Sequence, residues 1–285
     1  MKKVIVFGAS GNVGRNVVKE LVQHNYEVTA VVRTQEKAQQ LSELTMNHVI
    51  ADVQHKETLC GICDGFDIVI STLGKSVSIN DKSKSSFYDI DYFGNKYILD
   101  EAKKSKVKKF VYLSAIHAEK YQHFLYFKAH HNFSELLITS DIDYSIVKVP
   151  AIFSAFLDVM DLAKKGHLVT LGDGQCKTNP IYEGDVAKVI VNAIKTPFSI
   201  IEAGGSRIYT RKQINELIQQ SVNPTKKCRH VPVFLVGLLL PFIKIFDKNT
   251  YDKLSFFLEV TQHDVIAPMV GDSSLEEYIR MRVSH

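Results

Sequence analysis

Short apolar runs alternate with amphipathic stretches along most of this 285-residue chain. The runs that indicate strands span 4–7, 27–33, 48–53, 67–74 and 109–114. Unbroken, β-branched runs of this length are typical of strands buried on both faces of a sheet. Between them, apolar residues recur at helical spacing, for example over 13–22 and 92–104. The alternation predicts a doubly wound α/β fold with a parallel sheet and right-handed crossovers.

The pattern continues into the second half of the chain. We expect a helix over 151–166, a short strand over 168–174 and a further sheet strand over 200–203. Asp185 stands where the N-cap of a helix over 186–194 is expected. Residues 210–213 have capping-box form, so another helix should begin there. Together with the first half, this predicts a sheet of about seven strands and a smaller C-terminal lobe.

Three glycines follow the first apolar run at once. Gly8, Gly11 and Gly14 are spaced G-x-x-G-x-x-G between a buried strand and an amphipathic helix. Glycines allow close backbone approach, and the free N–H groups at a helix start bind negative charge. The turn therefore predicts a dinucleotide pyrophosphate site, although a plain tight β–α turn would carry the same residues. The expected cofactor contacts in this turn are Gly8, Ser10, Gly11, Asn12, Val13 and Gly14.

The end of the second strand bears on which dinucleotide binds. NAD-selective sites carry an acidic residue there, which binds the ribose hydroxyls. This chain has Val32 and Arg33 instead, with Lys37 one turn later. A guanidinium suits a 2′-phosphate, so NADP(H) is favoured and NAD(H) is the second choice. The alternative for Arg33 is an ordinary solvated cation at a strand end.

Other strand ends should deliver small or polar residues to the same edge of the sheet. Asp52, followed by Val53, could accept a hydrogen bond from the adenine or cap the next helix. Thr72, Leu73 and Gly74 end the fourth strand and would let a ligand approach the backbone, and Ser114 ends the fifth.

These motifs together resemble the short-chain dehydrogenase/reductase superfamily, and in particular its atypical, NmrA-like members. The matching segments are 8–14, 31–33, 51–53, 71–74, 110–114, Lys128 with 143–150, and 179–187. The resemblance covers about residues 1–220 and implies a Rossmann core over 1–152, completed by 178–204. Residues 153–177 and 205–285 would then form a smaller lobe for the substrate.

The resemblance also implies a reductase mechanism. Ser114 would polarise a carbonyl and Lys128 would hold the nicotinamide ribose and lower the pKa of a proton-donating tyrosine. Four residues before Lys128, where the family has that tyrosine, this chain has Phe124. Tyr121, one helical turn earlier, is the candidate substitute acid, provided that the helix extends so far.

Three functions follow from this combination. The first is an NADPH-dependent oxidoreductase that reduces a carbonyl or a quinone-type small molecule. The second is a non-catalytic NAD(P)-binding regulator or assembly factor, with Phe124 marking lost chemistry. The third is a sugar-nucleotide epimerase or dehydratase, which would also need the missing tyrosine. We expect an enzyme, and the oxidoreductase is the leading interpretation.

Charge and composition narrow the possible partners. The net charge is +4, and the densest basic run, over 103–109, closes a predicted helix, so nucleic-acid binding is not expected. The spacing of the histidines and of the pair Cys60 and Cys63 does not support a metal site. The N-terminal run is too short for a signal peptide, which favours the cytoplasm. The protein would be a monomer or a homodimer, and the resemblance implies that helices over 92–105 and 124–139 would form the dimer surface.

Residues 231–246 form the most apolar stretch of the chain. They are too few to span a bilayer comfortably, and two prolines and a glycine interrupt them. A buried helix of the lobe is the favoured interpretation. A surface for a membrane or a protein partner is the alternative.

Overall fold

The computed structural model describes residues 1–78 and 80–283. Two compact units emerge from their internal contacts. The first comprises Met1–Lys75, Ser85–Lys148 and Glu183–Glu202. The second comprises Ser76–Lys84, Val149–Tyr182 and Ala203–His285. Each is described by itself below.

A seven-stranded sheet in the order β3-β2-β1-β4-β5-β6-β9 forms the centre of the first unit. Its strands are β1 (Lys3–Phe7), β2 (Glu27–Val32), β3 (His48–Ile50), β4 (Ile68–Ser71), β5 (Lys109–Ala115), β6 (Asp143–Val149) and β9 (Ser199–Glu202). β1 pairs in parallel with both β2 and β4, so the strand order reverses beside β1. This confirms the predicted doubly wound α/β fold, in which ligands bind at such a reversal.

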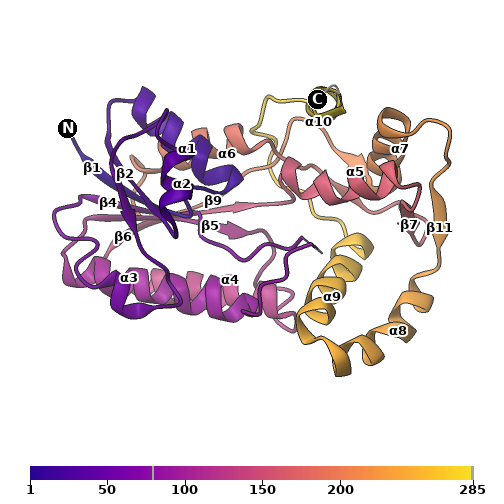
Figure 1. Ribbon diagram of the computed structural model, residues 1–285, viewed down its shortest axis with the longest axis horizontal. Helices are drawn as coiled ribbons and strands as arrows, with labels where there is room; N and C mark the ends of the chain where they lie inside the picture. The colour runs from indigo at the N-terminus through magenta and orange to yellow at the C-terminus, as the bar shows by residue number, and fades with distance from the viewer. Residues whose placement is uncertain (79, 284–285) are drawn as a thin grey trace. The chain divides into compact units, whose positions relative to one another are not determined.

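Helices cover both faces of this sheet (Figure 1). Helix α1 (Asn12–Gln23) packs with α6 (Glu183–Ala193) on one face, and α3 (Asn95–Lys104) and α4 (Leu125–Ile138) lie together on the other. The short elements are α2 (Gln35–Gln39), the 3₁₀ turn η1 (Lys56–Leu59) and the π-helical turn η2 (Tyr88–Gly94). Fully buried Ile5, Phe110 and Phe133 join sheet and helices in one hydrophobic core.

The second unit has its own core. It contains the 3₁₀ turn η3 (Phe153–Phe156), α5 (Leu157–Lys164), β7 (Val169–Leu171), β8 (Lys177–Thr178), β10 (Tyr209–Thr210), α7 (Arg211–Val222), β11 (Arg229–Val231), α8 (Val233–Phe246), α9 (Lys248–Gln262) and α10 (Leu275–Val283). Phe153, Met160, Ile214 and Ile279 meet between α5, α7 and α10. The capping box predicted at 210–213 is present, because Thr210 and Gln213 each bind the other's backbone N–H.

Several local predictions need correction. The helix expected over 151–166 begins as a 3₁₀ turn and becomes α-helical only at Leu157. Asp185 lies inside the first turn of α6 and not at its N-cap. Lys109, expected in a solvated basic run, is 4% exposed, and its ammonium binds Asp143 at 3.0 Å and the Thr196 carbonyl at 2.6 Å. Lys109 opens β5, which lies inside the sheet, and its buried ammonium is compensated by these two partners.

Cys60 and Cys63 lie in different environments. Cys60 is exposed just after η1, and Cys63 is buried beyond Gly61, whose φ is +69°. Burial, with the nearby Glu101 and Asp64 carboxylates, raises the pKa of Cys63 to about 12. Its thiolate is therefore suppressed at neutral pH.

The prediction of a buried helix over 231–246 is wrong. Helix α8 contains no buried residue. None of the helices in the described ranges is long and apolar enough to cross a membrane.

Candidate functional site

The glycine turn after β1 is packed so tightly that side chains would not fit. Gly8 has φ +74°, and a Cβ there would lie 2.8 Å from the backbone carbonyl carbon of Thr72. A Cβ on Gly14 would lie 2.1 Å from the Gly8 oxygen. The glycines therefore let the start of α1 approach β1 and the end of β4.

The first turn of α1 presents its backbone N–H groups without a side-chain cap. Gly11 is the N-cap, with φ −74° and ψ 169°, and it supplies no side-chain hydrogen bond. Asn12 is exposed beside it, whereas Val13 anchors the turn in the core. Uncapped N–H groups and the helix dipole favour an anion. Together with the glycine packing, this arrangement fits a dinucleotide pyrophosphate.

Cations lie beside this turn at the end of β2. Arg33 is exposed, and its side chain makes no hydrogen bond or ion pair with the described parts of the chain. Thr34 caps α2 by accepting the Lys37 N–H at 3.3 Å. Arg15, which the sequence reasoning did not consider, donates to the Gln40 carbonyl at 3.1 Å. The position of Arg15 in the first turn of α1 is the sequence feature that could have identified it.

The end of β4 lies directly against the glycine turn. The Thr72 hydroxyl donates to the Phe7 carbonyl at 3.1 Å, which joins the two segments. Gly74, two residues after Thr72, is exposed. The structure therefore brings together the residues predicted on β1, α1 and β4.

Val53 lies close to the same loop, but Asp52 has a local role. A Cβ on Gly94 would lie 3.0 Å from Val53 and 3.1 Å from Leu73, so both side chains pack on that glycine. Asp52 accepts the Gln54 N–H at 3.0 Å and is not the N-cap of a helix. Its carboxylate therefore holds the turn after β3.

Two buried polar residues that sequence reasoning missed hold the loop after β4. The Asp91 carboxylate accepts the Lys75 N–H at 2.5 Å. Asn95 accepts the Ser71 hydroxyl at 2.5 Å and donates to the Asp91 carbonyl at 2.9 Å. Both residues are fully buried. They occur in η2 and the first turn of α3, and their spacing of four was the signal available.

Burial raises the pKa of Asp91 to about 8, although the Lys75 N–H and ammonium oppose the shift. Its Oδ2 has no hydrogen-bond partner within the described residues. Burial therefore favours the neutral form of this carboxyl group, which supports the loop that carries Leu73 and Gly74.

The structure does not bring the predicted catalytic residues together. Ser114 is 2% exposed, and its hydroxyl lies 3.4 Å from that of Ser134 on α4. His130 is on the same face, with its Nδ1 2.7 Å from the Tyr112 hydroxyl. Lys128, by contrast, is exposed. Two residues from His130 amount to a rotation of about 200°, which turns Lys128 to the opposite side of the helix.

The residue at which α4 begins determines whether Tyr121 is part of that helix. α4 begins at Leu125 with Phe124 as an extended N-cap, so Tyr121 is not on the helix. The predicted shared helical face with Phe124 therefore does not exist. Instead, the ring of Tyr121 lies 5.4 Å from that of Phe127.

The histidines of this region do not form a metal site. Burial lowers the pKa of His130 to about 4, so its ring is neutral and bound to Tyr112. His130 is buried and belongs to the core. Among residues 1–78 and 80–283, no group of three histidine, cysteine or acidic side chains could hold a metal ion.

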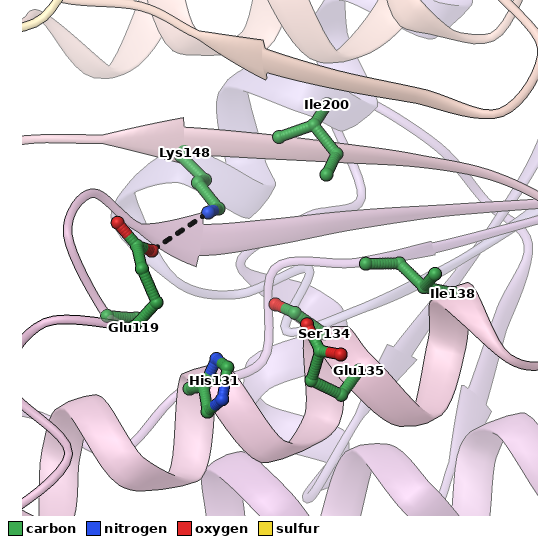
Figure 2. A pocket seen from close by; sticks show the side chains of 8 residues that line it. Glu119, His131, Ser134, Glu135, Ile138, Lys148 and Ile200 are labelled. Carbon is green, nitrogen blue, oxygen red and sulfur yellow. Dashed lines mark hydrogen bonds and ion pairs between the residues drawn. The ribbon is translucent and has the colours of Figure 1, made fainter.

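A small cavity lies between α4 and the strands β6 and β9 (Figure 2). Glu119 and Lys148 form an ion pair across it at 3.1 Å, and His131 and Ser134 face it from the helix. Its volume is about 150 Å³. Typical ligand pockets measure about 300–1,000 Å³, so this cavity is too small for a dinucleotide.

A model of the NAD(P)H-binding family matches residues 8–197. The chain belongs to this NAD(P)H-binding family. The match begins at the first glycine of the turn and ends just before β9. It confirms the class of cofactor predicted from the glycine turn, and it confirms the resemblance to an NAD(P)-binding family.

Relatives in the family differ in what they do. The photosystem II assembly factor Ycf39 of Cyanophora paradoxa is 29% identical over 266 residues, which cover 89% of this chain and 79% of the relative. The chloroplastic divinyl chlorophyllide a 8-vinyl-reductase of Arabidopsis thaliana is 29% identical over 307 residues, covering 96% of this chain and 72% of the relative.

Solved structures share the fold over the whole chain or nearly all of it. The NADPH complex of an NADPH-dependent quinone oxidoreductase from Escherichia coli has a TM-score of 0.73 at 16% identity, covering 98% of this chain and 99% of its own. A triphenylmethane reductase from Citrobacter has a TM-score of 0.74 at 16% identity, with 100% of both chains covered. At such identity the likeness establishes the fold.

Proposed function

We propose that the protein is an NADPH-dependent oxidoreductase that reduces a quinone-type or carbonyl small molecule. The observation that carries the proposal is the combination at the carboxyl ends of β1 and β2. The start of α1 has no side-chain cap, and it follows a turn whose glycines leave no room for side chains at Gly8 and Gly14. The exposed Arg33 follows β2 where NAD-selective sites have an acid. A cation at this place supports NADPH over NADH.

The cofactor contacts follow from that geometry. The pyrophosphate would be held by backbone groups of the glycine turn, namely Gly8, Ser10, Gly11, Asn12, Val13 and Gly14. Arg33 would bind the 2′-phosphate, and Asp52 and Val53 would contact the adenine. Thr72, Leu73 and Gly74 would lie against the middle of the dinucleotide. Asp91 would act as a positioning residue, since its carboxyl group fixes the loop that contains Gly74.

Bound nicotinamide would supply a hydride. Phe124 cannot donate a proton, and Tyr121 lies outside α4. An acceptor that takes hydride without a fixed protein donor, such as a quinone, suits this arrangement better than a simple ketone. The roles predicted for Ser114 in substrate orientation and for Lys128 at the ribose remain proposals. We place substrate selection in residues 153–177 and 205–285, and the reaction in the cytoplasm.

One relative of known activity supports a reductase. The vinyl-reductase from Arabidopsis thaliana aligns with 96% of the chain, and the quinone oxidoreductase from Escherichia coli shares its fold. An epimerase is a weaker third choice, because that chemistry leans on the tyrosine that Phe124 replaces.

The second candidate is an NAD(P)-binding regulator or assembly factor. The observation that favours it is the separation of Ser114, which is buried, from Lys128, which is exposed. The assembly factor from Cyanophora paradoxa supports this possibility, since it aligns with 89% of the chain.

Consumption of NADPH distinguishes the two candidates. The purified protein is mixed with NADPH and with a panel of quinones and aldehydes, and loss of NADPH absorbance is followed. Turnover with a quinone that Gly14→Val abolishes supports the oxidoreductase. Phe124→Tyr should add turnover with aldehydes if the rest of the site is intact. Tight NADPH binding without turnover in either protein would instead favour the regulator.

A further inference from the structure

Helix α8 exposes a continuous apolar stripe. Half of its fourteen residues are large apolar side chains that are at least 45% exposed. They are Phe234, Leu235, Leu238, Leu239, Phe242, Ile245 and Phe246. At 100° per residue these positions fall within an arc of about 140° on one side of the helix. We call this set the α8 stripe.

The opposite side of α8 already has a partner within the second unit. α8 packs against α9, which follows it directly in the chain (Figure 1). Lys244 lies over the ring of Tyr251 on α9, at 5.0 Å from its centroid. Asp247 fastens the connection by accepting the N–H groups of Asn249 and Thr250 at 3.0 and 3.1 Å. The α8 stripe is therefore the side that these intramolecular contacts leave exposed.

Charge indicates what covers the stripe. Residues 224–250 contain five cations and one acid, so this segment carries as much net charge as the +4 of the entire chain. The cations flank the helix on both sides in the sequence: Lys226, Lys227 and Arg229 before it, and Lys248 after it. All four are exposed. The one acid, Asp247, is engaged as the cap of α9.

We infer that the α8 stripe binds the surface of an anionic lipid bilayer. An apolar stripe flanked by cations is the arrangement of helices that lie in the membrane interface, where anionic headgroups pair with lysine and arginine. At 1.5 Å per residue α8 is about 21 Å long, shorter than the hydrocarbon core of about 30 Å, so it lies on the bilayer and does not cross it. A second copy of the chain fits less well, because both copies would bring the same positive charge together.

Vesicle co-sedimentation of the full-length protein tests this inference. We expect binding to vesicles that contain phosphatidylglycerol, little binding to pure phosphatidylcholine, and weaker binding at high salt. Phe242→Ser should lower the affinity for the anionic vesicles at least tenfold. The matched control is Phe198→Ser, since Phe198 in the first unit is 63% exposed and Phe242 is 65% exposed. The control should bind like the wild type.

A second pair of variants tests the charge. Lys226→Gln combined with Lys227→Gln should weaken binding to anionic vesicles, whereas Lys19→Gln combined with Lys195→Gln should not. Unchanged melting temperatures show that each variant is folded, as expected for exposed positions.

Three results would overturn the inference. The first is absence of binding to anionic vesicles, and the second is an equal loss in Phe242→Ser and Phe198→Ser. The third is a dimer in analytical ultracentrifugation that Phe242→Ser dissociates, because the α8 stripe would then be a subunit interface. None of these measurements depends on the proposed reductase activity.

Discussion

Two apolar segments of this chain differ in how far they are buried. In β1, Val4, Ile5 and Val6 are fully buried. In α8, which is longer and almost as apolar, Phe242 is 65% exposed and Phe246 is 88% exposed. The difference lies in their neighbours. β1 is paired on both sides, with β2 and β4, whereas α8 packs against α9 and leaves its other side exposed.

The comparison shows when an apolar run predicts burial. The run in β1 is followed by a glycine turn and a helix, so the topology that surrounds it can be predicted and burial follows. The run in α8 belongs to no repeating unit of strand and helix, so its hydrophobicity alone did not say whether the protein or another surface covers it. The predictions below test the two regions in turn, from the largest expected effect to the smallest.

Gly14→Ala should have the largest effect. Its Cβ would lie 2.1 Å from the Gly8 oxygen, a backbone atom that cannot move without disturbing β1. We expect a loss of about 2–4 kcal/mol in the free energy of unfolding and at least a hundredfold weaker NADPH binding. Urea denaturation and calorimetric titration measure the two effects. Wild-type stability in the variant would contradict the packing described for the turn.

Asp91→Asn should change the pH dependence of stability. The carboxyl group has a pKa of about 8 in the folded protein and 3.8 as its ordinary value. The folded state therefore holds the proton more tightly, and stability is lost as the pH rises between these two values. The loss approaches about 1.4 kcal/mol per pH unit, and the variant should lack it. Denaturation at pH 5, 6, 7 and 8 gives the two slopes.

His130 provides an internal check on that experiment, because its contribution has the opposite sign. Its pKa is lowered to about 4 by burial, so stability falls as the pH drops from about 6.5 toward 4. Between about pH 4 and 6.5 the two contributions oppose each other, so the wild type should be nearly flat there and Asp91→Asn should expose the acid limb of His130. Loss of both limbs in the variant would mean that the substitution disturbs the core and not only the carboxyl group.

Arg33→Ala should weaken NADPH binding by about ten- to a hundredfold, because a charge-assisted contact with the 2′-phosphate is lost. NADH has no such phosphate, so its affinity should stay the same. Lys37→Ala is the matched control, since the Lys37 ammonium is already bonded to Gln40 at 3.2 Å. An equal loss for both nucleotides would argue against the assigned role of Arg33.

Gly237→Ala should have the smallest effect, and a favourable one. Gly237 lies in α8, and a Cβ there would have no atom within 4 Å. Replacing a helical glycine by alanine should stabilise the protein by about 0.5–1 kcal/mol. Gly14→Ala and Gly237→Ala make the same substitution in two helices. We expect the first to lower the free energy of unfolding and the second to raise it. A thermal melt measures the effect of Gly237→Ala, and destabilisation would mean that α8 is packed more closely than described.

The sequence was sufficient for the sheet, the glycine turn and the place of Arg33, because these depend on local spacing and on strand order. It was not sufficient for side-chain direction on α4. Whether Lys128 faces Ser114 depends on the phase of the helix, and the extended Phe124 just before Leu125 sets its start. Asp91 was missed because hydrophobic periodicity does not identify a buried polar residue in a π-helical turn. The sequence was also not sufficient for the α8 stripe, because what covers the stripe is a partner outside the chain.

Calorimetric titration of the wild-type protein with NADPH, and then with NADH, tests the central claim most directly. If the turn after β1 and the cation after β2 form a working dinucleotide site, NADPH will bind with one-to-one stoichiometry and at least tenfold more tightly than NADH. Equal affinities would contradict the role of Arg33. Failure to bind either nucleotide would contradict the site itself.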